Sequence, residues 1–184
     1  MEKINYAMSS YAVLILLVIA LPFMITGCFD NKITDGNKEG NIAAVKKYFN
    51  AIDNKAASAM SVLFAADARQ DFVGNDPIIG VKSIETKLEL ALSQFESMKT
   101  EFINFAADGN SVFAHVKHTA VFKAGGAVKN RPGITPPVVI FTEPVTVSWQ
   151  AMASFRFEDG LIVEEIIVRD ELAILQQIGT LTVK

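Results

Sequence analysis

The sequence predicts an α+β domain in which a curved antiparallel sheet packs on about three N-terminal helices and carries a short C-terminal helix. Three observations support this prediction. Apolar residues recur at helical spacing up to Met98, the pattern then changes to alternation, and two glycine-containing turns at residues 108–110 and 158–160 separate long alternating segments. A sheet of such long strands must curl to cover helices on one face, so we expect a cone with an open mouth.

The predicted helices span residues 41–52, 56–65, 82–97 and 171–178. Asn41 is suited to be the N-cap of the first helix, because its side chain can accept a hydrogen bond from the first turn. Residues 53–55, Asp-Asn-Lys, should end that helix. Gly179 should end the last helix, because glycine readily adopts the left-handed conformation at the C′ position.

The predicted strands span residues 68–73, 99–107, 111–123, 142–157 and 161–169. Every second residue from Val145 to Phe157 is apolar, which predicts one covered face and one wet face for that strand. Residues 124–141 hold three glycines and three prolines, and we expect them to form a loop.

An apolar run at residues 11–27 precedes Cys28, the single cysteine of the chain. A membrane-spanning helix needs about 20 apolar residues, whereas a signal-peptide core needs roughly 7–15. Residues 25–28, Ile-Thr-Gly-Cys, resemble the lipoprotein box of bacterial lipoproteins. The resemblance implies cleavage before Cys28 and lipidation of its side chain and new N-terminus, which is enough for stable anchoring. The alternative is an uncleaved membrane anchor with an incidental cysteine.

This interpretation divides the chain into a signal peptide (1–27), a lipidated cysteine with a polar tether (28–40) and a folded domain (41–184). Phe29 follows the cysteine, and the sorting rule of Gram-negative lipoproteins would then favour the outer membrane. The signal peptide holds one acid and one base, so the formal net charge stays at −3. Without a basic stripe, nucleic-acid binding has no electrostatic support.

The domain contains five segments that form a recognisable set. They are LFAADA at 63–68, the turn at 77–80, FRFEDGLIVE at 155–164, VRD at 168–170 and LQQIG at 175–179. Together they resemble the SnoaL-like (polyketide cyclase-like) family of the nuclear transport factor 2-like superfamily. The resemblance implies a cone-shaped α+β barrel with an internal pocket, and a homodimer surface on the outer sheet face along strand 142–157. It implies no single activity, because the superfamily includes isomerases, cyclases, hydrolases, dehydratases and ligand binders.

The cyclase branch of this family uses an aspartate near the end of the last strand as general base, and Asp170 stands at that place. An apolar pocket would raise the pKa of such a carboxyl group. The alternative is that Asp170, directly before the last helix, is the N-cap of that helix.

The two histidines, His115 and His118, lie three apart on one predicted strand and should face opposite sides. One of them should therefore face the interior, where it could polarise a ligand oxygen or pair with Asp170. They cannot bind one metal together, and without a cysteine cluster we expect no metal site.

Four aromatic residues are candidates for the pocket wall, with ordinary core packing as the alternative for each. They are Tyr48, Phe49, Phe72 and Trp149. The limonene-epoxide-hydrolase branch needs a tyrosine, an asparagine and an Arg-x-Asp pair to hold its water. This sequence places Gln70, Phe72, Val116 and His118 at those positions, so we do not expect that activity.

The sequence therefore favours a membrane-tethered, cell-envelope domain that binds a small hydrophobic molecule and needs no cofactor. One alternative is a cyclase or isomerase that uses Asp170 as base on a carbonyl-bearing substrate, with His118 or His115 assisting. Another is a non-catalytic homodimeric interaction module.

Overall fold

The computed structural model describes residues 37–129 and 138–179, which lie in the compact unit Asp35–Lys184. The predicted signal peptide, Cys28 and most of the tether fall outside the described residues. Within the described ranges, no helix has the length and apolar character that a membrane crossing requires.

The first helix, α2 (Lys38–Asp53), begins earlier than expected because Asn37 caps it. The Asn37 side chain accepts a hydrogen bond from the Gly40 backbone N–H at 2.9 Å. The prediction of Asn41 as N-cap is therefore wrong, and Asn41 lies buried within the helix. Residues 38–40, which the prediction placed in the tether, belong to this helix.

The second predicted helix is shorter than expected and consists of η1 (Ala57–Ala59) and α3 (Met60–Leu63). It ends where the chain becomes extended at Phe64. The next helix, α4 (Val81–Leu92), also ends before its predicted boundary, because Phe95 already pairs with Phe122 in the sheet. The last helix, α5 (Glu171–Gln177), agrees with the prediction, and Gly179 after it has a φ of 75°.

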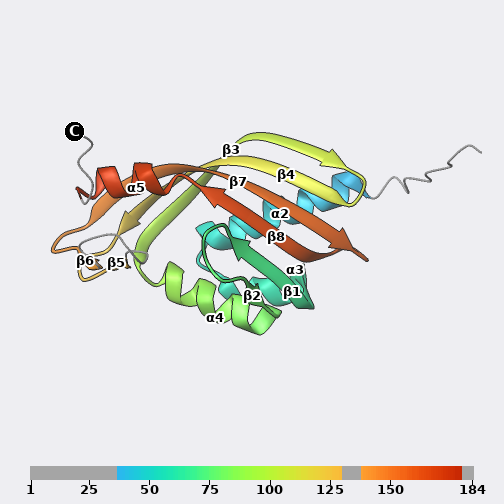
Figure 1. Cartoon of the computed structure of the whole chain (residues 1–184), viewed down its shortest axis with the longest axis horizontal. Coiled ribbons are helices and arrows are strands. Elements are labelled where there is room, and N and C mark those ends of the chain that lie inside the picture. Colours follow the sequence, from blue (N-terminus) through green and yellow to red (C-terminus); the bar gives the residue numbers. More distant parts are fainter. Residues whose placement is uncertain (1–36, 130–137, 180–184) are drawn as a thin grey trace, which may run out of the picture. The chain divides into compact units, whose positions relative to one another are not determined.

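Six strands form the main sheet, and Figure 1 shows them in one layer with α2 across one side. In spatial order they are β2 (Ile78–Ile79), β1 (Phe64–Phe72), β8 (Leu161–Arg169), β7 (Val145–Glu158), β4 (Ser111–Phe122) and β3 (Phe95–Asp108). The β3–β4–β7–β8 part is the antiparallel meander that the alternation predicted. Strand β1 joins the sheet parallel to β8.

The connections between strands agree with the predicted turns in two places and differ in a third. The β7–β8 hairpin turns at Asp159 and Gly160, with φ of 49° and 79°. Gly109, with a φ of 54°, turns β3 into β4. The segment expected to be only a loop instead contains a two-stranded ribbon, β5 (Ala127–Lys129) paired with β6 (Val138–Ile140).

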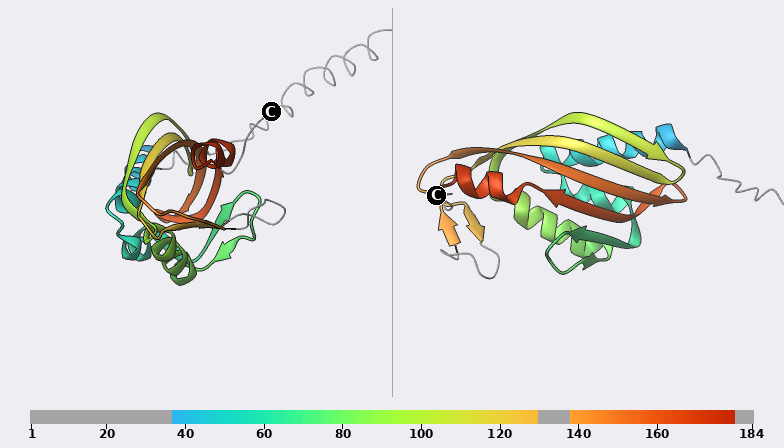
Figure 2. Two further views of the ribbon diagram at one scale, coloured as in Figure 1. Left: turned by 90° about the vertical axis from the view of Figure 1, so that its left-hand side faces the viewer. Right: turned by 45° about the horizontal axis from the view of Figure 1, so that its top comes forward.

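The core lies on the concave face of the sheet, which curves around it in the end view of Figure 2. Along β7 every second residue from Val147 to Phe157 is buried, as the alternation predicted. Helix α2 buries Val45, Tyr48, Phe49 and Ile52. Helix α5 is held to β7 because the Gln177 side chain bonds both backbone groups of Ser148. This arrangement is the predicted α+β cone.

Candidate ligand-binding site

A cavity of about 340 Å³ lies inside the cone, between the concave sheet face and helices α2, α4 and α5. Most of its wall is apolar. Six aromatic residues contribute to it: Tyr48, Phe49, Phe72, Phe95, Phe122 and Trp149. All four aromatic residues proposed from the sequence as pocket wall therefore border one cavity. Trp149 is 7% exposed and its ring centroid lies 6.5 Å from that of Phe95.

The central polar group of this wall is His118, which projects from β4 and is only 6% exposed. Its ring lies between the rings of Phe49 and Trp149, with centroid distances of 5.8 and 5.3 Å. Burial lowers the pKa of His118 to about 4, and the nearby Arg169 charge acts in the same direction. His118 is therefore neutral at physiological pH.

A chain of hydrogen bonds fixes the His118 ring from behind. Its Nδ1 lies 3.0 Å from the hydroxyl oxygen of Thr100 in β3. That hydroxyl donates to Oδ1 of Asp53 at 2.6 Å, and the Thr100 backbone N–H donates to Oδ2 at 2.8 Å. Sequence reasoning missed both partners, because Asp53 had the signature of a helix end and Thr100 that of an ordinary strand residue.

Two charged residues complete the cavity wall near α5. The guanidinium of Arg169, the last residue of β8, lies 5.8 Å from the centre of the Phe72 ring. Arg169 also forms an ion pair with Glu171, and both residues border the cavity. The cavity is therefore apolar in its depth and carries paired charges at one side.

Asp170 is exposed and is not among the residues that line the cavity. Its Oδ1 accepts a hydrogen bond from the Ala173 backbone N–H at 2.9 Å, which makes it the N-cap of α5. This geometry supports the capping role weighed for Asp170, and it gives the general-base role no partner in the cavity.

His115 lies on the opposite side of the sheet from His118, as their spacing predicted. Its Nε2 lies 2.7 Å from the side-chain oxygen of Gln150, and it borders a shallow hollow on the outer face. The structure therefore brings together His118 and the four aromatic candidates, and separates them from His115 and Asp170.

A second polar cluster, which the sequence did not single out, lies buried in the core. Glu165 of β8 is 0% exposed, and its Oε2 accepts a hydrogen bond from Gln70 Nε2 at 2.6 Å. Its Oε1 has no hydrogen-bond partner. Burial raises the pKa of Glu165 to about 7, while Gln70 and the nearby Tyr48 hydroxyl partly oppose that shift. The same burial, together with the Glu165 charge, raises the pKa of Tyr48.

No group of three or more possible metal ligands occurs among the residues that the structure describes. The cavity contains one histidine and one carboxylate, and Arg169 already pairs with that carboxylate. This residue set offers organic ligands apolar contact and a few polar ones.

Comparison with known families places the chain. The SnoaL-like domain profile matches residues 45–165, which is more than half of the sequence. The chain belongs to the SnoaL-like domain family. Comparison with curated proteins finds no match.

Several solved structures share the fold of this SnoaL-like protein. A proposed SnoaL-like polyketide cyclase from Jannaschia sp. CCS1 has a TM-score of 0.63 and 15% identity, covering 79% of this chain and 95% of its own. An epoxide hydrolase of the LEH-like type from M. tuberculosis has a TM-score of 0.58 and 18% identity, covering 77% of this chain and 90% of its own. A phenazine biosynthesis-related protein from Pseudomonas aeruginosa has a TM-score of 0.57 and 15% identity, covering 80% of this chain and 90% of its own. At these identities the likeness shows the fold alone.

Proposed function

We propose that this SnoaL-like domain binds a small hydrophobic molecule inside the cone. The cavity of about 340 Å³ with its aromatic wall is the observation that carries the proposal. Ligand pockets typically measure about 300–1,000 Å³ and are lined mainly by apolar and aromatic side chains with few polar groups. This cavity falls at the small end of that range, so it suits a compact ligand of one to three rings.

The proposal is tested with prodan, a neutral fluorescent probe that has no hydrogen-bond donor. We expect saturable binding with blue-shifted emission, because the cavity removes the probe from water. Ala151 is buried and borders the cavity, so Ala151→Phe should fill it and abolish binding. Ala43→Phe, on the exposed side of α2, is the matched control and should bind as the wild type does. Equal binding by both variants would contradict the proposal.

A second candidate function is proton transfer on the bound ligand. His118 favours it, because a neutral imidazole at a cavity wall can act as a general base. Several structural neighbours are proposed polyketide cyclases, and this likeness motivates the candidate. The cyclase or isomerase alternative therefore depends on His118 more than on Asp170, whose carboxylate caps α5.

We further propose that Cys28 is lipidated and holds the domain at a bacterial membrane, with the outer membrane as the site in a Gram-negative cell. The lipoprotein-box resemblance supports this proposal. Residues 29–36 separate Cys28 from the Asn37 cap, and an extended chain of this length reaches about 30 Å. Metabolic labelling with palmitate should mark the wild type and not Cys28→Ser, and equal labelling of the two proteins would contradict the lipid anchor.

The outer face of the sheet supports a third proposal, that two copies of the chain associate there. Four apolar side chains lie exposed on this face around a hollow of about 260 Å³: Phe113, Met152, Ile166 and Val168. We name this set the outer patch. Its members come from β4, β7 and β8, so the surface extends on both sides of the strand expected from the sequence.

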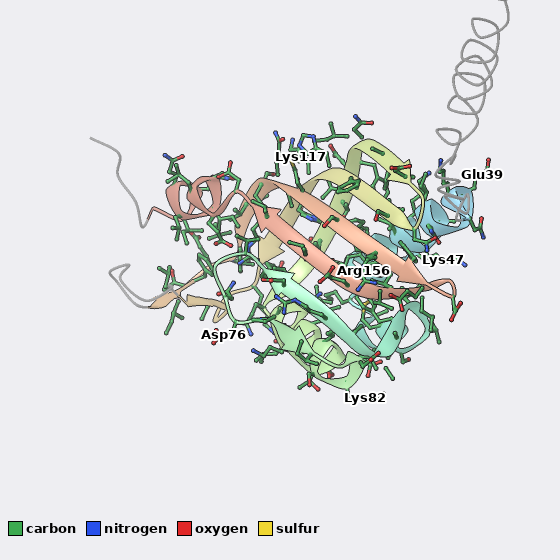
Figure 3. All side chains as sticks on the ribbon, turned by 45° about the vertical axis from the view of Figure 1, so that its right-hand side comes forward. Glu39, Lys47, Asp76, Lys82, Lys117 and Arg156 are labelled. Carbon is green, nitrogen blue, oxygen red and sulfur yellow. The ribbon has the colours of Figure 1, made fainter. Side chains whose placement is uncertain are left out.

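The charges around the outer patch favour a second copy over other partners. Figure 3 labels Lys117 on β4 and Arg156 on β7, which pairs with Glu158 and Glu164. Arg69 also pairs with Glu164 and with Asp71, so two arginines face three carboxylates at this end, an excess of one negative charge. Lys117 lies four residues from Phe113 along β4. Antiparallel apposition of two copies would place opposite charges together and cover the apolar centre.

A further inference from the structure

We propose that the cavity selects ligands that carry a hydroxyl or amine hydrogen, which they donate to Nε2 of His118. This inference rests on the proposed ligand-binding function and deepens it by naming the ligand class. It follows from counting the hydrogens in the chain of bonds from Asp53 through Thr100 to His118.

The Thr100 hydroxyl has a single hydrogen, and Asp53 determines where it points. An ionised carboxylate only accepts hydrogen bonds, so the hydroxyl donates to Asp53 Oδ1 across 2.6 Å. The second Asp53 oxygen is held by the Thr100 backbone N–H at 2.8 Å, which keeps the carboxylate in place. The contact of 3.0 Å between Thr100 Oγ1 and His118 Nδ1 must then be donated by the ring. A neutral imidazole with its hydrogen on Nδ1 has a bare lone pair on Nε2.

That lone pair has no hydrogen-bond partner among the described residues, although the side chain is only 6% exposed. A ligand that fills the cavity removes Nε2 from water, and an acceptor buried without a partner is costly, so a ligand that supplies a donor gains affinity at this point. The ring also stays neutral, because burial and the Arg169 charge both lower the His118 pKa. Arg169 is the charged group that acts on the His118 pKa, while Asp53 bonds Thr100 behind the ring.

The direction of this bond separates two ligand classes. A group that only accepts, such as a ketone or an ether oxygen, finds no hydrogen on Nε2, so the expected polarisation of a ligand oxygen does not fit this tautomer. A phenol or alcohol does fit it. The neighbouring rings of Phe49 and Trp149 favour an aromatic body for the molecule that carries the hydroxyl.

The tautomer is tested by nitrogen NMR on protein labelled at its two histidines. His118 should show a protonated Nδ1 and an unprotonated Nε2. The spectrum of His115→Gln, which retains only His118, assigns these signals. Thr100→Val removes the hydroxyl and should shift the His118 population away from this tautomer. Thr119→Val is the matched control, because the Thr119 hydroxyl bonds that of Ser148 and not the His118 ring. A His118 ring protonated at Nε2 in the wild type would overturn the inference.

Ligand selection is tested with α-naphthol and its methyl ether, which differ by the donor hydrogen. We expect the wild type to bind naphthol about tenfold more tightly, the size of one neutral hydrogen bond. His118→Phe should bind both equally. If prodan and the ether bind but naphthol has no advantage, the inference fails and the proposed function stands. If none of the three probes binds, both fail.

Discussion

The Gln70 side chain donates a hydrogen bond of 2.6 Å to Glu165 across the parallel β1–β8 pair, inside the core. Both side chains are at most 2% exposed. One carboxyl oxygen of Glu165 has no partner, so ionising this group in the folded protein is costly. Burial raises the pKa of Glu165 to about 7.

The first prediction concerns Glu165→Gln. The folded-state pKa of Glu165, about 7, lies above the ordinary value of 4.5. Between these values the Glu165 side chain has lost its proton in the unfolded chain but keeps it in the folded protein, so its contribution to the free energy of unfolding falls as pH rises. The loss is on the order of 3 kcal/mol above pH 7. The stability advantage of Glu165→Gln over wild type should therefore grow from pH 4.5 to 7, measured by urea denaturation.

The neighbouring Glu164 provides the control for this experiment. It lies on the outer face, where it pairs with Arg69 and Arg156 at 3.9 and 3.5 Å. Glu164→Gln should lose little stability, because such surface pairs contribute at most about 1 kcal/mol. A stability difference between Glu165→Gln and wild type that does not change with pH would show that the buried carboxyl is not the titrating group.

The second prediction is the opposite pH trend for His118→Gln. The folded-state pKa of His118, about 4, lies below the ordinary 6.5, so the unfolded chain binds a proton first as pH falls. The His118 contribution therefore lowers the free energy of unfolding as pH falls from 6.5 to 4, and the variant lacks this contribution. Over much of this range the His118 and Glu165 contributions to the pH dependence of stability cancel. A variant of either residue should therefore show the pH dependence that the other residue causes. Thermal unfolding of both proteins at pH 4.5, 5.5 and 6.5 measures how their stability difference changes with pH. Melting temperatures that change with pH in parallel for variant and wild type would contradict the prediction.

The third prediction separates the two roles considered for Asp170. Asp170→Ala removes the cap of α5 and should lower the free energy of unfolding by about 1 kcal/mol. Asp170→Asn retains an acceptor oxygen and should be nearly as stable as the wild type. Prodan binding, measured alongside chemical denaturation, should be the same for all three proteins. A variant that folds with unchanged stability but loses turnover of a ligand would restore the general-base role.

The fourth prediction tests association through the outer patch. Met152 lies at the centre of the outer patch and is 62% exposed. Met152→Glu would place two like charges face to face in a symmetric dimer. We expect the dissociation constant, measured by sedimentation equilibrium, to rise at least tenfold. Val62→Glu is the control, because Val62 is 73% exposed on α3 and away from the sheet face. A wild type that stays monomeric at millimolar concentration would contradict the proposal.

Much of the fold could be predicted because local patterns determine it. The alternation along β7, the bounds of β8 and the glycine turns depend on residues close in sequence. The parallel pairing of β1 with β8 could not be predicted, because it joins segments about 95 residues apart. The N-cap was misplaced because Asn37 and Asn41 are equally suitable side chains, and only the helix start decides between them.

The candidate site was predictable in its apolar part and not in its polar part. Tyr48, Phe49, Phe72 and Trp149 are large aromatic residues on faces that the spacing identifies. The bonds of His118 to Thr100 and then Asp53 depend on the register of β3 against β4 and on the position of the α2 end. Alternation likewise places Glu164 and Glu165 on opposite sides, but the side that is buried follows from tertiary packing.

Trp149 is the only tryptophan of the chain, and it lies in the cavity wall beside the His118 ring. Indole emission responds to the polarity of its surroundings and is quenched by a protonated imidazole nearby. The emission of Trp149 therefore depends on whether the cavity is occupied and on the charge of His118. Its intrinsic fluorescence can follow filling and emptying of the interior of the purified domain without any added dye.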